Sequence, residues 1–503
     1  MSWKDTAEPV LTRMPTVRRP QRHVPFKRKL MWTAGILVLY FFLTNVHLFG
    51  MPVDPEAGDA FGRFRSILAG GAGTIMHLGI GPIVTASIVL QLLGGADLLG
   101  LDTENNPRDQ VLYQGLQKFL VLVMICLTGL PMVFASDYLP ASRAVQELLP
   151  IGKMGLKWLI FAQIALGGVL ILYMDEIVSK WGVGSGVGLF IIAGVSQQLF
   201  GGLTIRQFGD AGSFADLSLG LIPRWAGFVS NWLNLGVGEV EFPTTVSGWL
   251  LTDAGLEIIP IITTILIFVI VVYAESVRVE IPLSHARVKG ARGRFPVKLI
   301  YASVLPMILV RALQANIQFL GQILHQQWAG MPGWVGQYAD EGAQVTGGVF
   351  YYLAPVQSRQ EWMWWLGGQA SNMEPWQIFL RVGIDLGIMV FAGGLFAIFW
   401  VETTGMGPES TAQQIQNSGM QIPGFRQNPS VLEKVLERYI PQVTVIGGML
   451  VGFLAVMANL LGTIGGVSGT GLLLTVSITY KIYEEIAEEQ LMEMHPMMRQ
   501  MFG

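Results

Sequence analysis

A glycine-rich run, Gly182-Val-Gly-Ser-Gly-Val-Gly188, has the residue types of a phosphate-binding loop. Glycines let a backbone approach phosphate, but a nucleotide site also needs a preceding strand and either an acidic ribose partner or a closing Gly-Lys-Ser/Thr. The sequence offers none of these around the run. Small residues at the start of an apolar stretch are typical of close helix packing in membranes. We therefore expect a packing role, with the energy for any work supplied from outside this chain.

Metal and redox chemistry find little support in the sequence. The histidines are scattered, and none has a second His or Cys at a metal-ligand spacing. The single cysteine, Cys126, lies in an apolar stretch and permits neither an intrachain disulfide nor a thiolate cluster. The apolar stretches also lack a nucleophile set. We expect no metal, no cofactor and no catalytic residues, so the enzyme class is disfavoured.

Polar side chains inside apolar stretches are costly in a membrane and mark sites of interest. The stretch 299–322 carries Arg311, Gln314 and Asn316 and is expected to face a cavity, a partner helix or a moving seam. Arg311 alone has a second interpretation, in which its long side chain reaches a membrane interface. The next apolar stretch begins with Arg381 and Asp385. No chain of carboxylates or histidines crosses the stretches, which weakens the alternative of a small-solute transporter.

The composition places these residues in a membrane protein. Of 503 residues, 51% are hydrophobic and only 13% are charged, which is far more apolar than a soluble domain requires. Windows that cross about 30 Å of hydrocarbon at about 1.5 Å per residue predict ten helical spans. The spans are 30–48, 75–94, 111–135, 155–175, 183–202, 256–274, 299–322, 378–400, 443–461 and 467–483.

The distribution of charge predicts the orientation. The tail before the first span is rich in Arg and Lys, and such residues are retained in the cytoplasm. The connection between spans 6 and 7 is also basic, whereas the one between spans 5 and 6 is acidic. The first span follows a long polar tail and lacks a cleavage site, so no cleavable signal peptide is predicted. We expect a multi-pass protein of the cell (plasma) membrane with both termini in the cytoplasm.

The number and order of the spans predict how the chain is divided. We predict an all-α polytopic fold of ten transmembrane helices in two inverted five-helix halves. The alternative is that ten spans divide by two without any repeat. The expected segments are a basic cytoplasmic tail (1–29), an N-terminal half (30–202), an outer connection (203–255), a C-terminal half (256–483) and a cytoplasmic C-terminal tail (484–503).

Two segments between spans have unusual compositions. Residues 61–73 are too short to cross a bilayer and too apolar for an ordinary loop, so they form either a re-entrant piece or an amphipathic helix on the outer surface. The connection between spans 6 and 7 clusters Arg287, Lys289, Arg292 and Arg294. Such a cluster binds anionic lipid headgroups or the phosphates of RNA, and both remain open.

Several motifs together carry a resemblance to a known family. The chain resembles, over nearly its whole length, the archaeal SecY family, the channel-forming subunits of the Sec protein translocon. The motifs are Leu78-Gly-Ile-Gly-Pro-Ile-Val-Thr-Ala86, Tyr173-Met-Asp-Glu-Ile-Val-Ser-Lys-Trp-Gly-Val-Gly-Ser-Gly186, Tyr273-Ala-Glu-Ser-Val-Arg-Val-Glu-Ile-Pro282, Phe399-Trp-Val-Glu-Thr-Thr-Gly405 and Arg438-Tyr-Ile-Pro441.

The resemblance implies a passive channel that conducts signal-bearing polypeptides across the membrane and releases membrane segments sideways into lipid. An apolar ring would constrict the pore, because aliphatic side chains form a dewetted seal and offer a passing chain no specific bonds. The ring residues implied are Ile80, Val84, Val187, Ile191, Ile308 and Leu474. From the residues alone, these six are ordinary core or lipid-facing side chains.

Two moving parts are implied as well. The segment 61–73 would be a short re-entrant plug helix beneath the ring, represented by Phe61, Arg63, Arg65, Ile67, Leu68, Gly70 and Gly71. A lateral gate would lie between spans 2–3 and 7–8, with polar positions at Thr85, Thr128 and Asn316. Some family members have an acidic residue where this chain has Thr128, so the bonding of this gate is open.

The resemblance also implies partners. Cytoplasmic loops would dock on ribosomal RNA through Arg287, Lys289, Arg292, Arg294 and Arg426. Small SecE-like gamma and Sec-beta membrane subunits, signal-bearing nascent chains and the lipid bilayer would complete the assembly. The driving force would come from the ribosome or from another motor.

Overall fold

The computed structural model describes most of the chain. Its described residues are 3–22, 24–51, 69–71, 73–95, 99–101, 106–135, 142, 145, 152–207, 218–233, 257–285, 292–299, 305–328, 330–339, 344–366, 373–417, 420–421 and 429–494.

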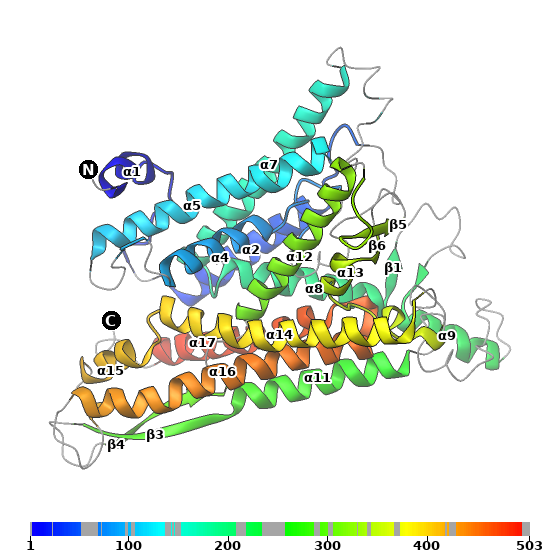
Figure 1. Cartoon of the computed structure of the whole chain (residues 1–503). Coiled ribbons are helices and arrows are strands. Elements are labelled where there is room, and N and C mark those ends of the chain that lie inside the picture. The colour runs from blue at the N-terminus through cyan, green and yellow to red at the C-terminus, as the bar shows by residue number, and fades with distance from the viewer. Residues whose placement is uncertain are drawn as a thin grey trace.

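Ten helices correspond to the ten predicted spans and run side by side as a bundle (Figure 1). Among the described residues, seven helices are long and apolar enough to cross a membrane, and α4 is a shorter apolar helix. The polytopic all-α fold class is thereby confirmed. The helices are α2 (Phe26–Thr44), α4 (Gly81–Gly95), α5 (Pro107–Leu130), α7 (Gly152–Trp181), α8 (Gly186–Leu203), α11 (Ile258–Ser276), α12 (Leu305–Gln327), α14 (Pro375–Thr403), α16 (Pro429–Leu461) and α17 (Gly469–Met494).

Some helix boundaries differ from the prediction. Hydropathy predicts that the second span begins at residue 75, but turns occupy the approach and α4 begins only at Gly81. Gly79 adopts a φ of +55°, which a helix does not permit, and Pro82 then occupies the first turn, where proline is tolerated. Consequently Ile80 lies just before the helix. At the other end of the chain, α17 continues to Met494, so the predicted C-terminal tail begins inside a helix.

Close packing of small residues brings α14 against α16. A Cβ atom placed on Gly448 would lie 2.6 Å from the carbonyl oxygen of Gly393, which is too short for a real contact. Glycine at both positions therefore allows the two backbones to approach, as is typical of helices packed in lipid.

The helix α11 has an apolar exposed face. Ile262, Ile265 and Phe268 are each more than half exposed, as expected of a surface that faces hydrocarbon.

The connections between helices carry short regular elements. The connection between α8 and α11 includes β1 (Ile205–Gln207), β2 (Ser218–Leu219) and α9 (Leu221–Trp232), with β1 and β2 antiparallel. The connection after α12 includes β5 (Gln337–Ala339), β6 (Gln344–Gly347) and α13 (Val349–Leu353), followed by the single turns η4 (Arg359–Glu361) and η5 (Trp364–Leu366). A π-helical turn, η1 (Pro131–Ala135), extends α5, and α15 (Pro408–Asn417) and η7 (Ile464–Gly466) precede α16 and α17 respectively.

The N-terminal helix and the C-terminal end of α17 lie at the same end of the bundle (Figure 1). The N-terminal helix α1 (Trp3–Leu11) is held at the start of α5 by a 3.0 Å ion pair between Lys4 Nζ and Asp109 Oδ2. Farther along the tail, Lys180 donates from α7 to the carbonyl of Val17 at 2.6 Å. Lys29, at the start of α2, pairs with Glu489 near the end of α17. An even number of crossings between the termini fits this arrangement.

Candidate functional site

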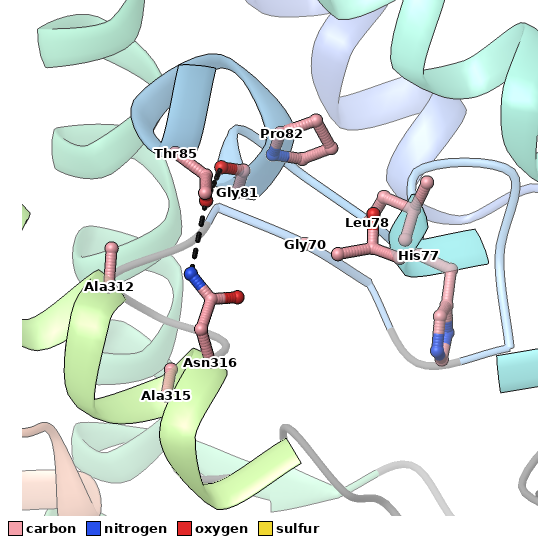
Figure 2. Close-up of a pocket in the computed structure, with 10 residues that line it drawn as sticks. Gly70, His77, Leu78, Gly81, Pro82, Thr85, Ala312, Ala315 and Asn316 are labelled. Carbon is pink, nitrogen blue, oxygen red and sulfur yellow. Dashed lines mark hydrogen bonds between the residues drawn. The ribbon is translucent and has the colours of Figure 1, made fainter. Parts of the chain in front are cut away.

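A polar contact bridges α4 and α12 (Figure 2). Asn316 Nδ2 donates to Thr85 Oγ1 across 3.2 Å, and the Thr85 hydroxyl donates to the carbonyl of Gly81 at 2.9 Å. Ala312 and Ala315 lie beside Asn316 on the same helix, and their small side chains leave room at the contact. The contact between α4 and α12, here called the α4–α12 seam, therefore consists of a neutral hydrogen bond with small side chains beside it.

A pocket of about 480 Å³, part of it open to the surroundings, lies at this seam. Thr85, Thr128 and Asn316 all line it, so the structure brings the three predicted gate residues together. Thr128, however, donates its hydroxyl to the carbonyl of Met124, 2.5 Å away on its own helix. Only Thr85 and Asn316 are bonded to each other. His77 also lines the pocket, and sequence reasoning missed it because a lone histidine in a turn carries no pattern.

The predicted ring residues lie in the main hydrophobic cluster of the bundle. Ile80, Val84, Ile191, Ile308 and Leu474 are all at most 5% exposed, and Val187 is half-buried against the same cluster. They come from the approach to α4, from α4 itself, and from α8, α12 and α17. Aliphatic side chains from four helices thus meet in one core without hydrogen-bonding groups of their own. This arrangement suits a seal rather than a binding site for a polar solute.

Of the predicted plug residues, Gly70 and Gly71 are described, whereas Phe61, Arg63, Arg65, Ile67 and Leu68 lie outside the described residues. The end of the segment is anchored: Tyr40 donates its hydroxyl to the carbonyl of Ala69 at 2.9 Å. A Cβ atom on Gly71 would lie 2.9 Å from the carbonyl oxygen of Thr44, so glycine is required at that close approach. Gly70 lines the pocket at the seam.

The basic connection between α11 and α12 forms a β-hairpin, which is not among the elements predicted from the sequence. The strands β3 (Arg278–His285) and β4 (Arg292–Lys298) pair antiparallel, and β3 also pairs with β7 (Met420–Gln421). Arg292 and Arg294 occupy register positions on β4, opposite Ser284 and Pro282. Arg287, Lys289 and Arg426 lie outside the described residues. The pairing with β7 joins the hairpin to the connection that precedes α16.

Two buried ion pairs involve charged residues of α12 and α14. Arg311 is 2% exposed, and its Nη1 lies 3.4 Å from Asp385 Oδ1 on α14. The interpretation in which Arg311 reaches an interface is therefore wrong, whereas the expectation that its span faces a partner helix is confirmed. Arg381 on α14 pairs with Glu361 at 2.8 Å. The sequence pattern indicates Arg311 and Asp385 but does not pair them.

Comparison with known proteins identifies the family of this chain. Residues 74–483 match the family model described as SecY, and residues 38–73 match that of the plug domain of Sec61p. The chain belongs to the SecY family. Protein translocase subunit SecY of Haloferax volcanii is 71% identical over 100% of both chains. The same subunit of Archaeoglobus fulgidus is 48% identical, over 99% of this chain and 98% of the relative.

Solved structures agree with this assignment to the SecY family. One described as a protein-conducting channel has a TM-score of 0.74 and 37% identity, covering 97% of this chain and 98% of the other. Sec61 in a canine ribosome–channel complex from the endoplasmic reticulum has a TM-score of 0.72, with the same identity and coverage. The chain is therefore the central channel subunit of a protein translocon and a multi-pass membrane protein. The alternative of a small-solute transporter is set aside.

Proposed function

We propose that polypeptides cross this channel through the ring of Ile80, Val84, Val187, Ile191, Ile308 and Leu474. Support comes from the burial of these side chains in one aliphatic cluster to which four different helices contribute. In the closed state the ring excludes water, and its lack of polar groups prevents a passing chain from being held. The segment 61–73 acts as the plug on the outer side, with its C-terminal end tethered at Ala69 and Gly71.

The lateral exit lies at the α4–α12 seam. The observation that carries this proposal is the 3.2 Å hydrogen bond between Asn316 and Thr85, beside a pocket bordered by the end of the plug segment. A neutral bond of this kind contributes only about 1 kcal/mol. An apolar signal helix that binds the open seam can offset this loss through its own contacts, which shifts the population toward the open state.

The ribosome docks at the end of the bundle that carries the β3–β4 hairpin. A relative, Sec61, has been solved in a ribosome–channel complex. In this chain, pairing of β3 with β7 places two connections side by side, which supports a common docking surface for RNA phosphates at these connections. The same end holds both termini, which are then cytoplasmic. Small SecE-like gamma and Sec-beta subunits complete the working channel.

Substitution of a ring residue tests the pore. We expect Ile191→Ser, in the channel reconstituted into vesicles, to raise ion leak and to admit substrates with defective signal sequences, because a hydroxyl allows water into the constriction. The matched control is Ile160→Ser in α7, a side chain that is equally buried, at 0% exposed, but lies outside the ring. It should lower stability without leak. Equal leak from both variants would contradict the assignment of the ring.

A further inference from the structure

Arg311 is the largest of the fully buried side chains in the part of the chain that the structure describes, and the proposed pore does not use it. A buried ion pair generally stabilises a fold no better than apolar side chains of the same size. Moreover, Nη2 of Arg311 has no hydrogen-bond partner among the described residues. Stability alone therefore gives a poor account of a guanidinium in the centre of an apolar bundle.

The bonds of Arg311 connect three helices. Its Nη1 donates to Gln314 Oε1 at 2.8 Å and to Asp385 Oδ1 at 3.4 Å, and its Nε donates to Thr470 Oγ1 at 3.0 Å. Gln314 Nε2 donates to the same Asp385 oxygen at 3.1 Å, and the backbone nitrogen of Val356 donates to the other at 3.2 Å. Residues of α12, α14 and α17 thus share one buried network.

The network lies close in sequence to two ring residues. Arg311 follows Ile308 by three positions on α12, and Thr470 precedes Leu474 by four positions on α17. Residues three or four apart lie on the same face of a helix. The bond from Arg311 to Thr470 therefore fixes α12 and α17 to each other about one turn from the ring.

Toward α4, the polar bond that α12 makes is weaker. There, the seam with α4 carries the neutral Asn316–Thr85 bond. Hydrogen bonds with an ionised partner are roughly twice as strong as neutral ones. Because the charged bonds are stronger, we expect α12 to separate from α4 and to stay attached to α14 and α17.

We propose that Arg311 is a positioning residue that makes α12, α14 and α17 move as one body. It holds Ile308 in place relative to Leu474 in the closed channel and confines opening to the α4–α12 seam. This inference rests on the proposed function, because it takes Ile308 and Leu474 as parts of the ring.

The test replaces the whole ion pair with apolar residues, Arg311→Met together with Asp385→Leu. The full-length channel complex is reconstituted in phosphatidylglycerol vesicles, and chloride leak without substrate is measured beside thermal unfolding. We expect the unfolding temperature to be unchanged or higher, while leak rises on the order of tenfold as a minor open state gains population. Leak equal to that of the parent in a folded channel would overturn the proposal.

A second buried ion pair supplies the control. Arg381 pairs with Glu361 and donates to the carbonyls of Ala354 and Pro355, on the outer connection rather than on α12. The double variant Arg381→Met with Glu361→Leu should leave leak at the parental level. If this control leaks as much as the Arg311 and Asp385 variant, the effect belongs to buried charge in general and the proposal fails.

A conservative variant keeps the proposal testable if the apolar pair does not fold. Arg311→Lys retains the charge, but a single ammonium lacks the planar fork that reaches Thr470 and Asp385 together. We expect leak above the parent, and parental leak in a folded Arg311→Lys channel would overturn the proposal. Failure of the proposed function is seen separately, as a parent channel whose ring residues do not crosslink to a translocating chain.

Discussion

At the scale of single residues, the seam between α4 and α12 depends on Asn316 and Thr85. Both are neutral, so their bond can break and reform without burying an unpaired charge. Thr128 lines the same pocket, but its hydroxyl bonds to the carbonyl of Met124. From the sequence alone, Thr128 leaves open which residues hydrogen-bond across this seam. In the structure, Thr85 and Asn316 form that bond.

We predict that Asn316→Ala favours the open seam. Loss of the bond to Thr85 costs the closed state about 1 kcal/mol, and a change of that size alters a two-state ratio about fivefold. Thr85 keeps its bond to Gly81, so no new orphan hydroxyl opposes the change. The expected result is more efficient translocation of substrates with weakened signal sequences, measured by protease protection in vesicles.

The control for this substitution is Thr128→Val. It lines the same pocket and loses a hydroxyl of its own, but that hydroxyl bonds within its helix. We expect Thr128→Val to resemble the parent. If Asn316→Ala also resembles the parent, the hydrogen bond does not contribute to closure.

The sequence indicates which residues are unusual, but it does not pair them. Arg311, Asn316 and Asp385 stand out because they are polar side chains within apolar stretches. Their partners lie far away along the chain: Asp385 is 74 residues from Arg311, and Thr85 is 231 residues from Asn316. Only the packing of α12 against both α4 and α14 brings these groups together, and hydropathy contains no information about that packing.

At the scale of elements, the contact between α14 and α16 shows how small residues set helix positions. We predict that Gly393→Leu destabilises the channel, because a Cβ atom there would lie 2.9 Å from the carbonyl oxygen of Gly448 and 2.3 Å from Met307 Cε. Overpacking of this kind costs about 1–3 kcal/mol. Thermal unfolding in detergent should show a lower midpoint.

The same helix offers a matched control at Gly387. A Cβ atom on Gly387 would have no neighbour within 4 Å, so Gly387→Leu should be tolerated. Equal losses of stability at the two positions would contradict the assignment of the loss to close packing at Gly393.

The β3–β4 hairpin is the element that sequence reasoning missed. Apolar and polar residues alternate along both strands, but each strand also contains a proline, Pro282 or Pro296, and a proline within a run argues against a strand. Its pairing with β7 depends on a segment more than a hundred residues away. Conversely, hydropathy predicts where the spans lie, because most of them are long and apolar, and seven described helices could cross a membrane. It misplaces the start of α4 because hydropathy contains no information about the positive φ of Gly79.

The hairpin carries a prediction for ribosome binding. Arg292→Gln with Arg294→Gln should weaken binding of the channel to ribosomes and reduce its dependence on salt, because fewer phosphates are neutralised. Arg278→Gln is the control, since Arg278 lies at the opposite end of β3, in register with Lys298. Cosedimentation over a series of salt concentrations measures both. A salt dependence unchanged by the double substitution would count against RNA docking at this end of the hairpin.

At the scale of the whole molecule, one aliphatic cluster extends through the bundle and contains the proposed ring. On one side of α12 lies a weak neutral seam, and on the other lies a buried ionic network that joins it to α14 and α17. In the proposed mechanism, this asymmetry allows the channel to open sideways at the α4–α12 seam. The sequence alone indicates the ring only through its resemblance to a family, since buried aliphatic residues have no distinguishing pattern.

The central claim is that a polypeptide passes through the ring. The direct measurement uses the channel co-purified with its small partner subunits in vesicles, with a ribosome-tethered nascent chain that bears a signal sequence and a photocrosslinker at Ile80 or Ile191. The account predicts that the nascent chain is protected from protease and crosslinks to both positions, whereas a crosslinker at Ile160 gives no product. Protection without crosslinking at Ile80 and Ile191 would show that the chain crosses by another path and would contradict the account.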